Sequence, residues 1–499
     1  MMKADFWLTK KWLLVFSIVF LSVTEASAAG VQLTDTLSVT GLLRHELAIH
    51  AAGKKNPNNT LLGQADKNTV DLSRTVFRTE WTYKPNDIFK LYSKVRVISD
   101  QTEALDDDLL DYDAFPQSTP RYGTYLRATN DDEVNVEMSE LYADVNLGDL
   151  WVRLGKQQIV WGEMISARIL DIVNPLDLSW HFKFEPEEFE NIRVPQWTIR
   201  ARYEVAQRVV PLPWLKDLYL EGFVNPGDIS PQIYPAPGAP LNLKPPTSPL
   251  FQLREKDRRG DIECGFRIGG RVGQFAGTLN YLSLYTDSGH WESRAPLLPG
   301  PPSPANPFPT DNKYSRRDMY GVSLNYSFPY PINITATYEG VYSPDEPYQD
   351  RYSRLPHIRH NKTLKHAIRF DRKTFVLPHP ISAMMIQLQY SQTLVEDHDK
   401  IKSTPAPYTR GSNNIDSTKN VIALLLSQDL WHNNIKLTFK GIYDLDDCYY
   451  IVPGFKYKHG DHLIFDIYGV VLGGAETRTG SFGSIDWADE VFSRITYQF

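Results

Sequence analysis

The residues whose types are best suited to binding or catalysis lie in one segment, about 161–194, which separates two strand-like runs. Its polar and aromatic candidates are Trp161, Glu163, Arg168, Asp171, Asp177, Glu185, Glu187, Glu188, Glu190 and Arg193. Carboxylates and guanidinium groups at this density suit the binding and steering of charged solutes. Phe182, Phe184 and Phe189 give the same segment apolar anchors, so it has a reason to stay folded. We predict that it folds into a lumen as a pore constriction; the alternative is a surface loop packed on its neighbours.

A second set of charges lies on the strands expected around this segment. Period-two alternation places the basic side chains on one face, predicted to line a lumen: Arg74, Arg78, Lys90, Lys94, Arg96, Arg153, Arg200 and Arg202. Such a wall favours anions, and a facing acidic loop would create a transverse field across the bore. The alternative is that Glu80, Glu137, Asp144 and Glu204 on the same strands pair with these cations. We expect a preference for anionic or zwitterionic solutes, although the sequence does not identify the solute.

Within the constriction segment, Met164 to Val173 has the composition of a short helix that carries Arg168 and Asp171. Asn174-Pro175 would end it, because proline removes a backbone donor and clashes with the preceding turn. We therefore expect one helix at this place in the loop.

The elements that must position these residues are strands. Alternating segments are separated by connections that are in turn long and short, with Lys84-Pro85-Asn86-Asp87 and Gly148-Asp149 as examples of the short ones. The predicted strands are 33–51, 71–83, 88–99, 133–147, 150–160, 194–205, 216–225, 261–272, 274–287, 316–328, 332–343, 363–376, 382–395, 418–430, 435–444, 449–457, 461–472 and 487–499. The pattern predicts an all-β protein, a transmembrane antiparallel barrel of about eighteen strands, plus or minus two, with short periplasmic turns and long extracellular loops. The constriction segment is the third long loop.

The two ends agree with export to an outer membrane. Residues 1–28 read as a signal peptide, with Lys3, Lys10 and Lys11 before an apolar run and Ala26-Ser27-Ala28 at the expected cleavage site. Residues 29–499 would then form a single barrel domain. Tyr497 and Phe499 lie on one face of the last strand, and such an ending resembles the signal read by the barrel assembly machinery of Gram-negative outer membranes.

Composition limits the classes of protein. Aromatic residues make up 12% and the mean hydropathy is −0.37, while no run after the leader approaches the ~20 apolar residues of a membrane helix. A barrel explains both, because only alternate residues meet lipid; a soluble sandwich is the alternative. A formal net charge of −7 argues against a nucleic-acid-binding protein, which would be expected to carry a basic surface. Cys264 and Cys448 lie in no metal or redox motif, and a disulfide between them stays open.

Enzyme motifs are missing from the sequence. Neither a Gly-x-Ser-x-Gly nor a His-Glu-x-x-His motif occurs, and no Cys-x-x-Cys-His motif would attach a haem. We expect no catalytic residue, metal or cofactor, and a channel for small, anionic or amphipathic solutes. The expected partners are outer-membrane lipid and lipopolysaccharide, the assembly machinery, an unknown small solute and an optional periplasmic or inner-membrane protein. Two alternatives stay open: a hydrophobic-compound channel of the fatty-acid-transporter type, and the barrel sheath of an export or electron-conduit complex.

Three blocks of the sequence carry a family resemblance. They are Arg153-Leu-Gly-Lys-Gln-Gln-Ile-Val-Trp-Gly-Glu163, Asp171-Ile-Val-Asn-Pro-Leu-Asp177 and Arg193-Val-Pro-Gln-Trp197. Together they resemble the outer-membrane family called domain of unknown function 1302, specifically over about 151–205 and diffusely elsewhere. The resemblance implies an outer-membrane barrel of monomer size with an inner loop, and it brings no substrate.

Overall fold

The computed structural model describes fourteen segments of the chain. These are residues 30–60, 69–105, 126–127, 134–181, 189–205, 212–227, 230–243, 251–255, 261–293, 307–350, 356–375, 382–402, 415–474 and 482–499. The predicted signal peptide therefore lies outside the described residues. Among the described residues, no helix is long and apolar enough to cross a membrane.

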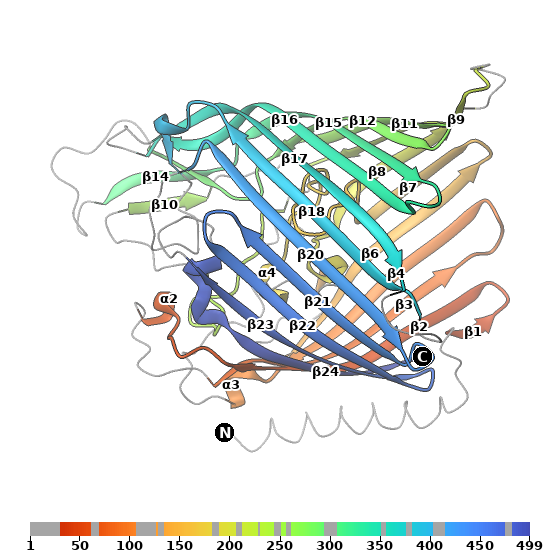
Figure 1. Cartoon of the computed structure of the whole chain (residues 1–499), viewed down its shortest axis with the longest axis horizontal. Helices are drawn as coiled ribbons and strands as arrows, with labels where there is room; N and C mark the ends of the chain where they lie inside the picture. The colour runs from red at the N-terminus through yellow and green to blue at the C-terminus, as the bar shows by residue number, and fades with distance from the viewer. Residues whose placement is uncertain are drawn as a thin grey trace.

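Eighteen antiparallel strands of the described chain form a closed barrel (Figure 1). Each strand pairs with its neighbours in the chain order, and the last strand, β24, closes the cylinder against β2 through Leu42↔Gln498 to His50↔Glu490. The strands are β2 (Leu37–His50), β3 (Val70–Tyr83), β4 (Phe89–Asp100), β6 (Val134–Leu147), β7 (Leu150–Gln157), β8 (Gln196–Glu204), β9 (Leu215–Asn225), β11 (Glu263–Val272), β12 (Phe275–Tyr285), β15 (Arg316–Phe328), β16 (Ile334–Asp350), β17 (Ile358–Thr374), β18 (Met384–Val395), β20 (Thr418–Leu430), β21 (Ile435–Asp444), β22 (Cys448–His459), β23 (Leu463–Gly474) and β24 (Glu490–Gln498). The predicted fold class and strand number are confirmed.

The remaining elements are short. β1 (Val31–Thr34), β5 (Leu126–Arg127) and β19 (Ile401–Lys402) add to the edge of the barrel sheet, and β10 (Phe251–Glu255), β14 (Phe308–Lys313) and β13 (His290–Ser293) make a separate small sheet. The helical pieces are α2 (Pro57–Thr60), α3 (Thr102–Leu105), α4 (Leu178–His181), α5 (Phe189–Ile192), η1 (His398–Lys400) and η2 (Phe482–Ala488). In Figure 1 the tight turns gather at the right-hand end with the C-terminus, and β10 and β14 lie at the opposite end.

Most strand boundaries fall within three residues of the prediction, and β16 and β17 are the main exceptions. β16 continues to Asp350 and β17 begins at Ile358, whereas the sequence predicted an end at 343 and a start at 363. Pro344 and Pro347 concealed this extension, because proline normally excludes a residue from a central ladder. Here Pro344 lies at a register shift between Ser343 and Glu346, beyond which the pairing resumes.

The predicted alternation of faces holds along the wall. Ile199, Leu324 and Leu388 are 51%, 47% and 46% exposed on the outer face, while Thr198 and Ser323 beside them are buried. A slip of one residue would turn charged inner side chains towards lipid, at about 2–4 kcal/mol for each Arg or Lys near the midplane. The register is therefore fixed by energy as well as by hydrogen bonding.

The interior of the barrel holds two apolar clusters that the chain's own loops complete. In the first inner cluster, loop residues Ile159, Trp161, Ile169, Leu170 and Val173 pack on wall residues Phe223, Leu282, Leu284, Met319, Val341 and Ala367. In the second inner cluster, loop residues Leu176, Leu178, Trp180, Ile192, Leu241 and Leu243 pack on walls formed by β2–β4 and β20–β24. The segment 158–195, called the inner loop below, thus contacts opposite sides of the lumen, and α4 lies within the barrel outline in Figure 1.

The seam of the barrel is closed by the chain terminus. Phe499 exchanges two backbone hydrogen bonds with Gly41, at 2.9 and 3.0 Å, and its ring stacks on Phe77 at 6.4 Å. Tyr497 pairs with Leu43 across the same seam. The reading of Tyr497 and Phe499 by an assembly machinery stays a prediction.

Candidate functional site

The inner loop leaves and rejoins the wall at a narrow neck. Asn174 clips its two ends together: its Oδ1 accepts from the backbone N–H of Ile159 at 2.7 Å, and its Nδ2 donates to the carbonyl of Val194 at 2.8 Å. The N–H of Asp177 donates to the carbonyl of Ile192 at 2.6 Å, and Arg193 forms an ion pair with Asp171 at 2.7 Å. The neck is therefore held by charge-assisted and backbone bonds rather than by packing alone.

The helix predicted over Met164 to Val173 is wrong. The structure has no helix there, and the two helical pieces of the described loop, α4 and α5, lie later. The reason is that wall side chains satisfy the loop's backbone donors: Glu339 on β16 accepts from the N–H groups of Glu163 and Leu170 at 2.5 and 3.2 Å. Helical hydrogen bonds are not needed where the wall supplies the acceptors.

Gln389 on β18 provides the second wall contact. Its Oε1 accepts from the N–H of Ile165 at 2.9 Å and its Nε2 donates to the hydroxyl of Ser166 at 2.7 Å. Gln389 and Glu339 are both fully buried. The sequence reasoning missed both residues; the only signal was a polar residue at an inward position of each strand.

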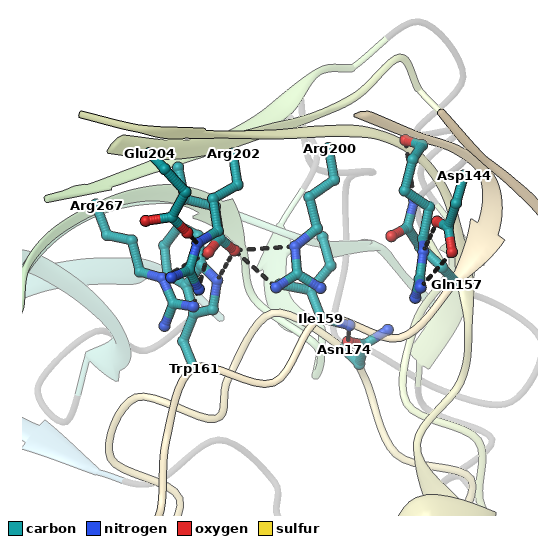
Figure 2. A network of polar contacts seen from close by, with 11 residues as sticks. Asp144, Gln157, Ile159, Trp161, Asn174, Arg200, Arg202, Glu204 and Arg267 are labelled. Carbon is teal, nitrogen blue, oxygen red and sulfur yellow. Dashed lines mark hydrogen bonds and ion pairs between the residues drawn. The ribbon is translucent and has the colours of Figure 1, made fainter. Parts of the chain in front are cut away.

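Trp161 anchors the start of the loop through a buried carboxylate (Figure 2). Its Nε1 donates to Glu221 on β9 at 2.9 Å, and the same carboxylate forms ion pairs with Arg200 at 2.7 Å and Arg267 at 2.8 Å. The Arg267 guanidinium lies 4.9 Å from the centre of the Trp161 ring. Gly162 follows because a Cβ there would come within 2.4 Å of the backbone nitrogen of Asp171. Glu221 and Arg267 were not among the predicted site residues.

Each predicted basic wall residue has a carboxylate partner within 4 Å. The pairs are Arg74–Asp100, Arg78–Glu80, Lys90–Asp144, Lys94–Glu140, Arg96–Glu137, Arg153–Asp144, Arg200–Glu221 and Arg202–Glu204. Arg74 also donates to the carbonyl of Trp180 at 2.6 Å, and the Arg96 guanidinium lies over the Trp180 ring. The basic wall thus consists of ion pairs, and two of its arginines, Arg74 and Arg96, also bind Trp180 in the second half of the inner loop.

The acidic residues of the loop separate into two groups. Asp171 and Asp177 are buried in the neck, where Asp177 accepts from the N–H of Ser179 at 3.0 Å. Glu163 and Glu190 are exposed, and Glu190 lies 3.8 Å from Arg78 on the wall. Arg168 donates to the carbonyls of Asp171 and Asn174 within the loop, both at 2.5 Å. Glu185, Glu187, Glu188, Phe182 and Phe184 lie outside the described residues.

The loop that follows β9 joins the inner loop, which the sequence did not indicate. Leu178 and Leu176 exchange backbone bonds with Ile233, each at 2.9 Å. Farther along, Asn56, Asn58 and Asn59 of the first long loop bind the backbone of 238–242, and Asn242 Nδ2 donates to Asn59 Oδ1 at 2.9 Å. This buried group, called the asparagine clasp below, joins the first and fourth long loops.

Removing one clasp residue should loosen the fourth loop. In Asn59→Ala, the carbonyls of Gly238 and Ala239 and the Nδ2 of Asn242 each lose one hydrogen bond, at about 0.5–1.5 kcal/mol for each bond. Hydrogen exchange should become faster at 230–243 and stay unchanged in the barrel strands. Asn434→Ala, an exposed turn residue at the other end of the barrel, is the matched control; equal exchange in both variants would contradict the role of the clasp.

Among the described residues, no group of three or more His, Cys, Asp or Glu side chains could hold a metal ion. Cys264 and Cys448 are not joined to each other, so the disulfide left open above does not form in this structure. The arrangement brings together paired charges, loop anchors and a few exposed carboxylates inside a cylinder.

Comparisons with known proteins give one family and a set of similar folds. The model of a family described as "Protein of unknown function (DUF1302)" matches residues 13–363. No curated protein sequence matches the chain. Among solved structures, OccAB3 of Acinetobacter baumannii is similar with a TM-score of 0.48 at 10% identity, over 93% of this chain and 99% of that one. The outer membrane channel DcaP of the same organism gives 0.40 at 11%, over 94% and 99%, and Salmonella typhi OmpF, solved with daunomycin, gives 0.39 at 9%, over 93% and 97%.

Proposed function

The chain belongs to the DUF1302 family of proteins of unknown function, and we propose that it is an outer-membrane channel through which small solutes pass. The observation that carries this proposal is a closed barrel, apolar outside, whose lumen is crossed by a loop docked on polar wall residues. Only such a closed sheet satisfies every strand's backbone in a bilayer. Insertion after cleavage of residues 1–28 and recognition of Tyr497 and Phe499 are parts of the same proposal.

The inner loop supplies the constriction of this channel. Most of its described apolar side chains are buried against the wall, whereas its carboxylates Glu163 and Glu190 are exposed. On the β8 wall, the side chains of Arg202 and Glu204 are 36% and 49% exposed. Exposed charges at a narrow place select ions and oriented dipoles by electrostatics. We therefore place the filter between the inner loop and the walls of β3 and β8.

The hydrophobic-compound alternative is less well supported. Ile169, an apolar side chain of the inner loop that such a path would need, is only 4% exposed and packs in the first inner cluster. The sheath alternative fits poorly as well, because the chain's own loops link opposite walls and a threaded partner would have to displace both inner clusters.

The test of the channel is passage through reconstituted protein. Liposomes that contain the barrel should swell in small sugars and organic acids, and planar bilayers should show steps of KCl current. Uptake of a labelled hydrophobic solute with neither swelling nor current would favour the fatty-acid-type alternative and overturn the proposal.

We expect ion selectivity to respond to the two arginines of the basic wall on β8. In Arg200→Ala/Arg202→Ala, two cations are lost while Glu221 and Glu204 remain, so the reversal potential in a KCl gradient should shift towards cations. Arg271→Ala is the control, because Arg271 is 50% exposed beside a tight turn, where salt screens its charge. An unchanged reversal potential in the double variant would show that these arginines do not face the permeation path.

A further inference from the structure

One cavity lies between the inner loop and the extracellular part of the wall. Arg168 of the loop, Arg317 on β15 and Lys365 on β17 line it, together with Glu346 on β16. β15 begins at Arg316 directly after a long loop, so this cavity lies near the end of the barrel that the long loops cover. It is separate from the Glu221 network that anchors Trp161.

The charges around this cavity do not balance. Arg317 Nη1 and Lys365 Nζ both approach the same oxygen, Oε1 of Glu346, at 2.5 and 3.5 Å. The nearest carboxylate of Arg168 is that of Asp287, at 3.9 Å, while Asp171 on the loop is bound by Arg193. The three cations thus have two carboxylates, Glu346 in the lining and Asp287 beside Arg168, and the one surplus positive charge favours an anion at this place.

Ser343 and Thr363 add two hydroxyl groups to the lining, and the rest of it is apolar. Ile169, Met319 and Val341 are buried members of the first inner cluster, and Ile172 packs against them. A cavity with cations on one side and hydrocarbon on the other matches a ligand that carries both features. A fully hydrated inorganic anion would lose solvation against the apolar side without replacement.

The size of the cavity restricts what enters it. Its volume is about 20 Å³, which is room for about one or two water molecules. A carboxylate head fits such a space, with its two oxygens in the place of water. The Lys365 side chain is 37% exposed, so the remainder of a ligand can extend past it into the lumen.

We propose that this cavity binds the head group of small amphipathic monocarboxylates, with Lys365, Arg317 and Arg168 as anion-binding residues. The proposed site rests on the proposed channel function. It would be the first position at which an entering acid binds, before that acid reaches the constriction. A bidentate carboxylate would share the charge that Glu346 and Asp287 now neutralise in part. The short apolar tail would lie along Ile172.

The experiment measures binding of butyrate, labelled with ¹³C at the carboxyl group, to the full barrel in nanodiscs by NMR line broadening. Wild type should bind butyrate, and the uncharged isostere butyramide and the polyhydroxylated gluconate should bind at least several-fold more weakly. Lys365→Gln should weaken butyrate binding about tenfold, the effect of losing one charged hydrogen bond. Lys365→Arg should restore most of it, and Lys362→Gln, which removes a 55% exposed lysine from the same strand, should leave it unchanged.

Two outcomes would overturn the site: equal binding of butyrate and butyramide, or equal effects of Lys365→Gln and Lys362→Gln. Arg168→Gln, checked for folding by its heat-modifiable gel shift, gives an independent variant with the same expected loss. The two proposals fail separately. A KCl current without butyrate discrimination refutes only the site, whereas butyrate binding without any current refutes only the channel.

Discussion

Replacing Leu170 with aspartate should release the inner loop from the wall and raise the single-channel conductance several-fold. Leu170 is fully buried among Leu282, Met319 and Val341, and loss of such a side chain alone costs about 2–5 kcal/mol. The new carboxylate would also lie near Glu339, which accepts the Leu170 N–H at 3.2 Å. An unpaired buried carboxylate adds several kcal/mol to this cost. Together the two costs exceed the roughly 0.5–3 kcal/mol that each of the four hydrogen bonds of the loop to Glu339 and Gln389 contributes. The expected result is that the loop detaches as a unit.

Conductance steps in KCl bilayers check this prediction. Val160→Asp is the matched control, since it adds the same charge to the same loop at a side chain that is already 41% exposed. Gly321→Leu tests the same contact without charge, because a Cβ at Gly321 would come within 2.5 Å of Leu170 Cδ2. Wild-type conductance in both Leu170→Asp and Gly321→Leu would show that the loop does not limit the current.

The second large effect concerns the buried carboxylate of Glu221. In Glu221→Ala, Arg200, Arg267 and the Trp161 Nε1–H lose their common acceptor, and breaking a buried ion pair in this way costs about 3–5 kcal/mol. We expect a loss of this size in the free energy of unfolding, measured by urea titration in lipid vesicles. The lumen also loses a negative charge, so the reversal potential should shift towards anions.

Glu204→Ala separates the two effects. It removes the same charge from a neighbouring inward position, but Glu204 is 49% exposed and its pair with Arg202 is worth about 1 kcal/mol or less. A loss of stability as small in Glu221→Ala as in Glu204→Ala would mean that the Glu221 network does not hold the loop.

The strands of the barrel wall could be predicted because the patterns that specify them lie within each strand and the turn beside it. Alternation fixes the face of each strand, and turns such as Gly148-Asp149 fix the register of the hairpin, so the Asp144–Arg153 pair follows from the sequence. The pairs Lys90–Asp144 and Lys94–Glu140 do not follow, because the long loop between β4 and β6 leaves the register of these two strands open.

The path of the inner loop could not be predicted, because residues far away in the chain decide it. Glu339 and Gln389 lie on strands that come about 170 and 220 positions after their loop partners, and they replace the helical hydrogen bonds expected for Met164 to Val173. The clasp residue Asn59 likewise meets Asn242 across 183 positions. In each case the sequence alone indicates only a polar side chain in contact with water, because the partner that it binds lies far away in the chain.

The position of the inner loop inside the lumen can be measured by cysteine cross-linking. With Cys264 and Cys448 changed to serine, the pair Ser166→Cys/Gln389→Cys should cross-link in the folded, membrane-inserted barrel, because these side chains touch at 2.7 Å. Ser166→Cys/Leu388→Cys should not, because Leu388 is the next residue on the same strand and faces outward with 46% exposure. No cross-link at 389, or equal cross-linking at 388 and 389, would contradict a loop that is docked on the inner wall.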